Sequence, residues 1–437
     1  MVRRIPRRSF LHIGGAAAAL ALPLSMIFAR RTRSRAPGRL GPLEPDPAGI
    51  LDLPAGFTYR ILERAGGGMD DGYRVPGRPD GMGCFPGPSG TFVLLRNHEV
   101  SPGDKAKGPY KSGQRAPAEA YDAASMGGVT RLVLDASTFA RVSSNLVLAG
   151  TNVNCAGGVS PWGWLSCEEN VDDRHGYVFL CSATASAVEA PRRLSGYGRF
   201  YHEAAVVDGA THIAYLTEDR ADGCFYRFKP ADPAAPFQGK LQALSVVGHP
   251  RLDTSAWAFA APREIAWVDI DDPDPKDDTV RKQAQARGAA VIRRGEGICS
   301  SNGAVYLCAT VGGPASAGQI FRLLPAGDGG TLELVAQSTD RDELDSPDNL
   351  TVAPWGDVVM VEDGYREDFI RGLTVDGKVY DIARNARSTS ELTGVCFSPD
   401  GKALFVNMQE DGLTLAVTGP FPEPGGAAAP RRAGVPG

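Results

Sequence analysis

Residues 154–170 read NCAGGVSPWGWLSCEEN, which predicts a short strand, a Pro-Trp-Gly turn and a second strand. In an antiparallel hairpin, the start of the first strand and the end of the second lie side by side. Cys155 is therefore expected to meet Glu168 and Glu169 at one edge of the hairpin. A thiol beside two carboxylates is costly to assemble unless a cation offsets the charge. We interpret this edge as part of a metal site.

The same hairpin pattern recurs along the chain. Each unit has a short apolar segment, a turn that ends in glycine and a strongly apolar strand. The turn glycines are Gly90, Gly163, Gly209, Gly303, Gly356 and Gly401. Several units continue into third and fourth strands. This repetition predicts an all-β fold, specifically a six-bladed β-propeller with inter-blade insertions.

The chain has 437 residues, of which 43% are hydrophobic and 22% charged, as is usual for a soluble globular protein. We expect a twin-arginine signal peptide at 1–29, a linker at 30–50, the propeller domain at 51–425 and a flexible C-terminal tail at 426–437.

The first residues predict export. Arg7, Arg8, Ser9, Phe10 and Leu11 resemble a twin-arginine signal, and the apolar stretch that follows is short for a membrane span. The expected location is periplasmic or secreted, with the twin-arginine translocase as a partner during export and no stable membrane span. An uncleaved anchor is the alternative. Removing residues 1–29 takes away four arginines and changes the net charge from −5 to −9. A chain this acidic, without a basic stripe, is a poor nucleic-acid binder.

Polar residues recur at the hairpin ends that would line one mouth of the propeller. At an interval of fourteen residues, Cys155 is matched with Glu169, Glu296 with Thr310, Asp348 with Glu362, Thr393 with Asn407, and Gly83 with Asn97, and Glu203 is matched with Glu218 at fifteen. Carboxylates that converge on one mouth would repel one another strongly. The pattern therefore predicts several bound cations.

The ligand types narrow the choice of metal. Carboxylate oxygens suit calcium, magnesium or ferric iron, whereas a thiolate from Cys155 indicates a transition metal. No HExxH pattern is present, which argues against a zinc hydrolase of that kind. Arg294, two residues before Glu296, suits a bidentate grip on phosphate, and a salt bridge to Glu296 is the alternative.

The sequence leaves the interpretation of two features undecided. The acidic run at 269–278 predicts either a solvated loop or a calcium loop. The eight cysteines permit disulfides after export, and Cys167 could join the metal site, form a disulfide or simply be buried.

Several motifs together resemble the PhoX-type alkaline phosphatases. They begin at Leu53 (LPAGF), Asp80 (DGM), Arg96 (RNHE), Asn154 (NCAGG), Cys167 (CEE), Tyr201 (YHE), Leu216 (LTED), Arg294 (RGEG), Ser346 (SPDN), Glu362 (EDG), Phe405 (FVNMQ) and Thr418 (TGPF). The resemblance implies a six-bladed propeller and an exported phosphatase that acts on small phosphate monoesters. It also implies a cofactor of two Fe³⁺ ions, three Ca²⁺ ions and a bridging oxo group.

The resemblance assigns roles to particular residues. The metal ligands it implies are Cys155, as an iron ligand, with Glu99, Glu169, Glu203, Glu218, Glu296, Asp348 and Glu362. Arg294 is the expected catalytic residue, and it is predicted to bind substrate together with Asn97. Two alternatives from other classes remain, a calcium-stabilised propeller lactonase and a non-catalytic binding module, neither of which needs a cysteine at the mouth.

Overall fold

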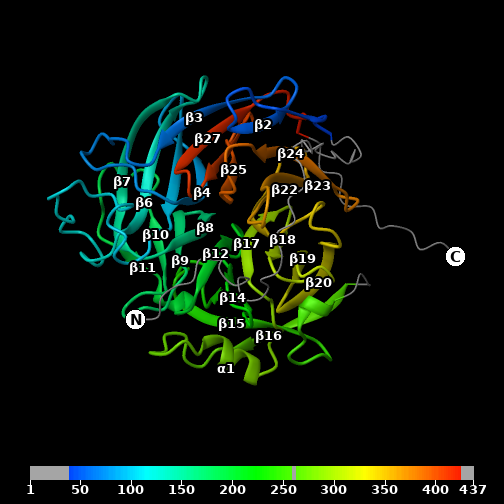
Figure 1. Cartoon of the computed structure of the whole chain (residues 1–437). Coiled ribbons are helices and arrows are strands. Elements are labelled where there is room, and N and C mark those ends of the chain that lie inside the picture. The colour runs from blue at the N-terminus through cyan, green and yellow to red at the C-terminus, as the bar shows by residue number, and fades with distance from the viewer. Residues whose placement is uncertain (1–38, 258–261, 425–437) are drawn as a thin grey trace, which may run out of the picture.

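The computed structural model describes residues 39–257 and 262–424, and β-strands dominate these ranges (Figure 1). The only α-helix within them is α1 (Val280–Ala286), and two 3-10 turns lie at Ser195–Tyr197 and Thr254–Ala256. No helix in the described ranges is long and apolar enough to cross a membrane. The segments predicted as signal peptide, residues 1–29, and as C-terminal tail, residues 426–437, lie outside the described residues.

Two four-stranded antiparallel sheets follow one another in the chain. The first contains β4 (Pro79–Pro86), β5 (Thr91–His98), β6 (Gly127–Asp135) and β7 (Arg141–Thr151). The second contains β8 (Asn154–Ser160), β9 (Gly163–Glu168), β10 (Val178–Cys181) and β11 (Arg192–Arg193). In both, the strands are neighbours in chain order.

The next sheet has nine strands because one strand joins two four-strand runs. The first run is β12 (His202–Val207), β13 (Ala214–Glu218), β14 (Phe225–Pro230) and β15 (Gly239–Val246), and the second is β17 (Gly295–Ser301), β18 (Ala304–Ala309), β19 (Gln319–Ala326) and β20 (Gly329–Gln337). The joining strand, β16 (Arg263–Asp269), pairs with β15 on one side and β20 on the other.

The last two sheets use strands from both ends of the described chain. One contains β21 (Pro347–Val352), β22 (Val358–Glu362), β23 (Phe369–Leu373) and β24 (Val379–Asn385), extended by β2 (Leu51–Pro54) and β1 (Leu43–Glu44). The other contains β25 (Leu392–Phe397), β26 (Ala403–Met408), β27 (Leu413–Thr418) and β3 (Thr58–Arg64). Since β1 pairs with β2, residues 43–44 belong to the fold, which corrects the prediction that 30–50 is only a linker.

The first strands of the six hairpins form the centre of the molecule. Each contacts the next in the order β4, β8, β12, β17, β21, β25 and back to β4. Figure 1 shows the sheets arranged around these strands. The prediction of an all-β, propeller-like fold is confirmed, although the strands form five sheets rather than six separate ones.

The predicted glycine turns connect the first and second strands as expected. One of them is the two-residue turn between β17 and β18, in which Asn302 has φ 51° and Gly303 has φ 77°. Two successive positive φ angles match the right-handed twist of the flanking strands, and Asn-Gly is the sequence that tolerates them best.

The core lies between neighbouring sheets. For example, Leu95 and Val129 of the first sheet pack in one cluster with Trp164 and Phe179 of the second. Alternating side chains on each strand supply apolar groups to both faces of a sheet, so the stacked sheets bury one another. This packing fixes the inner strands and hence the mouth that they surround.

Candidate metal centre

Each of the six inner hairpins contains a β-bulge at the same place, directly after the first paired residues of the inner strand. The register shifts fall between Pro79 and Met82, Asn154 and Gly157, His202 and Ala205, Gly295 and Ile298, Pro347 and Leu350, and Thr393 and Cys396. A bulge breaks the regular alternation and re-aims a side chain. We call the residue that follows the last pair before the shift the bulge residue.

Five of the six bulge residues are acidic or cysteine. They are Asp80, Cys155, Glu203, Glu296 and Asp348, with Gly394 at the matching place in β25. Because the inner strands contact one another side by side, these side chains start from one end of the strand ring.

The bulge residues combine with two further acids into three groups. In each group, one ligand atom per residue lies within 4.8 Å of the others. The groups are Asp80 with Glu99 and Cys155, Cys155 with Glu169 and Glu203, and Glu203 with Glu296 and Asp348. Cys155 and Glu203 each belong to two groups, so the three groups form one continuous row.

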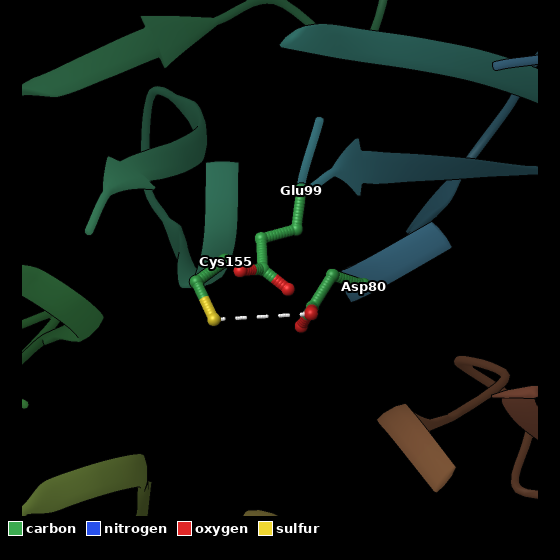
Figure 2. Close-up of side chains that lie close together, drawn as sticks. All are labelled: Asp80, Glu99 and Cys155. Atoms are coloured by element: carbon green, nitrogen blue, oxygen red, sulfur yellow. Dashed lines mark hydrogen bonds between the residues drawn. The ribbon is translucent and has the colours of Figure 1, made fainter. Parts of the chain in front are cut away.

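Figure 2 shows the first group from close by. The carboxylates of Asp80 and Glu99 and the sulfur of Cys155 turn toward one another. The Cys155 thiol donates a hydrogen bond to Asp80 Oδ2 at 3.8 Å.

The chemistry of the row fits bound metal. All seven side chains are buried, from 0% exposed for Glu203 to 7% for Glu169. Burial, and then the charge of Asp80, raises the pKa of the Cys155 thiol well above its usual value. A cation would favour the thiolate and offset the repulsion among the carboxylates. Oxygen ligands beside one thiolate suit a mixed set of hard and transition-metal ions.

The inner strands approach one another closely at this level. A Cβ on Gly81 would lie 2.6 Å from the Cα of Ala156, and one on Gly297 would lie 2.7 Å from the Cα of Asn349. Only glycine, which has no Cβ, permits such backbone contact. The close approach brings ligands from adjacent strands within reach of a shared ion.

Arg294 lies at the same mouth, directly before β17, with a left-handed φ of 51°. Its Nε donates to Asp219 Oδ1 at 2.8 Å, and its Nη2 donates to Asp219 Oδ2 at 3.0 Å and to Glu296 Oε1 at 2.8 Å. The salt bridge to Glu296 that the sequence left open is therefore present. The side chain is 23% exposed, so the guanidinium lies between solvent and the third group.

The comparison with known families agrees with this geometry. Residues 38–147 and 138–412 match the family described as alkaline phosphatase PhoX. The chain belongs to the PhoX family. The matched residues include all seven members of the row.

Solved structures resemble this PhoX-family chain only weakly. A gluconolactonase from Xanthomonas campestris has 13% identity over 87% of this chain and 98% of that chain, with a TM-score of 0.42. The periplasmic gluconolactonase PpgL of Pseudomonas aeruginosa has 12% identity over 85% and 93%, with a TM-score of 0.42. A luciferin-regenerating enzyme has 10% identity over 83% and 96%, with a TM-score of 0.45. Likenesses this weak carry no argument about function. No curated protein matches the chain significantly.

Glu218 lies outside the three groups, so its role as a metal ligand stays a prediction. It is the last residue of β13 and pairs with His202 rather than with Glu203. A one-residue change of register turns a side chain to the other face of the strand. Glu218 Oε2 accepts hydrogen bonds from the Cys224 amide at 3.0 Å and the Tyr226 hydroxyl at 2.7 Å. The carboxylate is thus engaged within its own sheet.

Glu362 is displaced from the row in the same way. It pairs with Pro347 instead of Asp348. Its Oε1 accepts hydrogen bonds from the Asp345 amide at 2.9 Å and from Arg371 Nε at 3.0 Å. The structure therefore places Glu362 among partners inside its own sheet, outside the three groups.

Asn97 has a supporting position in the structure, and its contact with substrate stays a prediction. It is fully buried, and its Nδ2 donates to the carbonyl oxygen of Cys155 at 3.0 Å and to that of the next residue at 2.6 Å. Its Oδ1 accepts from Trp164 Nε1 at 2.8 Å. Asn97 thus holds the strand that carries Cys155.

The sequence reasoning missed Asp80 as a ligand. Its sequence signal is that it directly precedes a small residue at the start of an inner strand. Three other bulge residues, Cys155, Glu203 and Glu296, do the same. The interval of fourteen pointed instead to Gly83, because β4 and β5, with eight residues each, are longer than the strands of the other inner hairpins.

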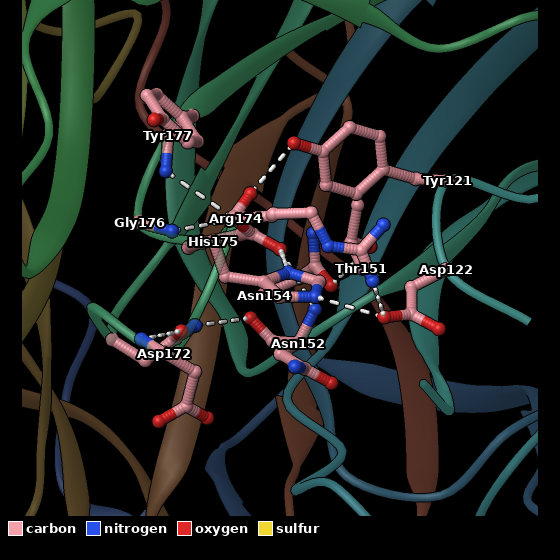
Figure 3. A network of polar contacts seen from close by, with 12 residues as sticks. Tyr121, Asp122, Thr151, Asn152, Asn154, Asp172, Arg174, His175, Gly176 and Tyr177 are labelled. Carbon is pink, nitrogen blue, oxygen red and sulfur yellow. Dashed lines mark hydrogen bonds and ion pairs between the residues drawn. The ribbon is translucent and has the colours of Figure 1, made fainter. Parts of the chain in front are cut away.

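A buried polar network supports the hairpin that carries Glu169 (Figure 3). Glu168 accepts hydrogen bonds from the amides of Asn152 at 2.9 Å and Gly176 at 2.8 Å, and its Oε1 lies 2.6 Å from His175 Nδ1. Burial acts to lower the pKa of His175, but the hydrogen bond to Glu168 and the charges of Glu168, Asp122 and Asp172 together outweigh it, so the pKa is raised. The anchored end of β9 fixes the start of the segment that carries Glu169.

The acidic run at 269–278 contains no group of metal-ligating side chains among the described residues. Its carboxylates have other partners: Asp269 bonds Lys240, Asp274 accepts from the Tyr177 hydroxyl, and Asp278 bonds Arg281. The solvated-loop interpretation is therefore the one that the structure supports.

None of the eight cysteines, all of which lie in the described part of the chain, forms a disulfide. Cys167 is fully buried in the apolar cluster with Leu165 and Val178. The structure thus assigns Cys167 to the core rather than to the metal row.

Glu218 predicts a pH effect on stability. Burial, only partly opposed by Arg281, raises its pKa from 4.5 to about 7. The stability that this group contributes is therefore present below pH 4.5 and is lost as the pH rises through about 7. We expect the melting temperature of the wild-type protein minus that of Glu218→Gln to decrease as the pH rises through this range. The total change corresponds to about 3 kcal/mol at most. A difference in melting temperature that stays constant with pH would refute the shift.

Proposed function

We propose that this PhoX-family chain is an exported, metal-dependent phosphatase that hydrolyses phosphate monoesters. The observation that carries the proposal is the row of three buried ligand groups, joined by Cys155 and Glu203, with Arg294 beside its third group. Family membership supports the same activity.

We propose two ferric ions, three calcium ions and a bridging oxo group as the cofactor. Cys155, which the first two groups share, would hold iron, because a thiolate is not a calcium ligand. The third group, with Glu203, Glu296 and Asp348, offers only carboxylates and suits calcium. When bound, the ions supply Lewis acidity at the phosphoryl group and offset the charge of the phosphate dianion.

The protein's own contribution is orientation. Asp219 and Glu296 hold the guanidinium of Arg294 from two sides. An arginine held in this way binds phosphate oxygens with little further loss of side-chain freedom. We propose that Arg294 grips the ester phosphate at the mouth.

The proposed number of blades and the proposed location of the protein rest on the sequence pattern. We count six blades by treating β12–β15 and β17–β20 as two blades, with β16 as an insertion between them. We also propose export by the twin-arginine translocase to the periplasm or the medium, and substrates that are small phosphate esters rather than nucleic acid.

The test is metal analysis of exported protein followed by turnover of an aryl phosphate. Iron near two per chain, calcium and a thiolate-to-iron absorption band are expected, and a chelator that strips the metals should abolish hydrolysis. A folded protein that contains calcium but no iron and does not hydrolyse the ester would contradict the proposal. That result would favour the lactonase or binding-module alternatives.

A further inference from the structure

The first group of the row lies at the seam between the first and last sheets. Gln409 follows β26 of the last sheet and is fully buried. Its Nε2 donates to Asp80 Oδ2 at 2.6 Å and to Glu99 Oε2 at 2.9 Å. One amide group therefore bridges two carboxylates of the same metal group.

Arg78 completes this arrangement from the first sheet. Its Nη2 donates to Gln409 Oε1 at 2.7 Å and to Glu99 Oε2 at 3.0 Å. The charge of Glu99, opposed by burial, raises the pKa of Arg78, so the guanidinium stays charged. Arg78 thus orients the amide of Gln409 and neutralises part of the charge on Glu99.

The last sheet differs from the others at the mouth. The residue directly after the second strand is Glu99, Glu169, Asp219, Thr310 and Asp363 in the first five hairpins, and Gln409 in the sixth. The bulge residue of the sixth hairpin is Gly394. This sheet therefore brings no carboxylate from these two positions and supplies a hydrogen-bond donor instead.

The same sheet also fixes the backbone of β4. Asn407 Nδ2 donates to the carbonyl oxygen of Asp80 at 2.7 Å, and Thr393 Oγ1 donates to that of Pro79 at 2.9 Å. Main chain and side chain of Asp80 are thus both held by residues more than three hundred positions away in the sequence.

We propose that Gln409 and Arg78 form a positioning pair that sets the metal affinity of the group formed by Asp80, Glu99 and Cys155. Two carboxylates that face one ion repel each other before the ion binds. Donors shared between them lower this repulsion and fix the direction of each ligand oxygen. Neither residue needs to contact substrate. The inference rests on the proposed metal centre but not on phosphatase activity.

The experiment is a titration of chelator-treated full-length protein with Co²⁺ alone, followed by the thiolate-to-cobalt absorption band that reports binding beside Cys155. Gln409→Met keeps the volume of the side chain and removes both donors. We expect the midpoint of the titration to shift to about 10- to 100-fold higher Co²⁺, the usual size of an effect from a residue that supports metal ligands. Gln409→Asn, which keeps the amide, should recover part of the loss.

The matched control is Gln319→Met in β19, which replaces another fully buried glutamine in a different sheet. It should titrate like the wild-type protein. If Gln409→Met does not fold, Arg78→Gln decides by the same measurement, because Arg78 is 25% exposed and is readily replaced. A variant within about twofold of wild type, or an equal loss in the control, would overturn the positioning pair. A wild-type protein with no thiolate band would overturn the metal centre itself.

Discussion

Cys155→Ala is expected to lower the turnover of phosphate esters by at least a hundredfold and to remove the thiolate absorption band. The reason is that Cys155 belongs to two of the three ligand groups, so its loss affects two neighbouring positions of the row at once. Loss of a residue that merely supports a ligand already costs about 10- to 100-fold in metal affinity or activity, and a direct ligand should cost more. The measurement is metal content per chain, the visible spectrum and the hydrolysis rate of an aryl phosphate.

Cys167→Ala is the matched control for this prediction. Cys167 is equally buried, lies in the same hairpin and packs in the apolar cluster, away from the row. We expect this variant to melt at a lower temperature because it leaves a small cavity, but to retain its metals and its spectrum. Full activity in Cys155→Ala, or equal loss of metal in both variants, would contradict the assignment of Cys155 as a ligand.

Arg294→Met is expected to reduce kcat for phosphate monoesters by about 100- to 1,000-fold, the usual effect of losing one donor to a charged transition state. Affinity for inorganic phosphate should fall with it, because the same guanidinium would grip the product. The metal content should change little, since Glu296 keeps its place in β17 and its two partners in the third group. Steady-state kinetics, phosphate inhibition and metal analysis on one preparation separate these effects.

Arg293→Met provides the neighbouring control. Arg293 precedes Arg294, pairs with Asp253 and is 42% exposed. It should leave kcat unchanged within about twofold. If Arg294→Met loses metal in proportion to activity, the arginine acts only by holding Glu296, and the proposal that it binds the ester phosphate is wrong.

The hairpins and their glycine turns could be predicted from the sequence because their signals are local. The Asn-Gly pair at 302–303 is one example, since a turn of two residues with positive φ needs little beyond those residues. Cys155 and Glu169 were also predicted to meet, and they do, because both lie at the open end of one short hairpin. In each case the partners are close in the sequence.

The register of the other hairpins could not be predicted in the same way. Counting residues matched Glu203 with Glu218, whereas a bulge shifts the pairing so that His202 lies opposite Glu218. A bulge has no strong sequence signal, and a slip of one residue decides whether a carboxylate faces the mouth or its own sheet. For this reason Glu218 and Glu362 lie outside the three groups, whereas Asp80 belongs to the first.

The sequence by itself determined the strand content, the order of the hairpins and the kinds of ligand that the chain offers, because these depend on side-chain chemistry and on neighbours a few residues away. Tertiary structure alone decided which side chains from different hairpins come together. Asp80 meets Cys155 across two inner strands, and Gln409 reaches Asp80 across the seam of the ring. Those distances depend on how closely the backbones of adjacent strands pack, and a linear pattern of residues does not contain that information.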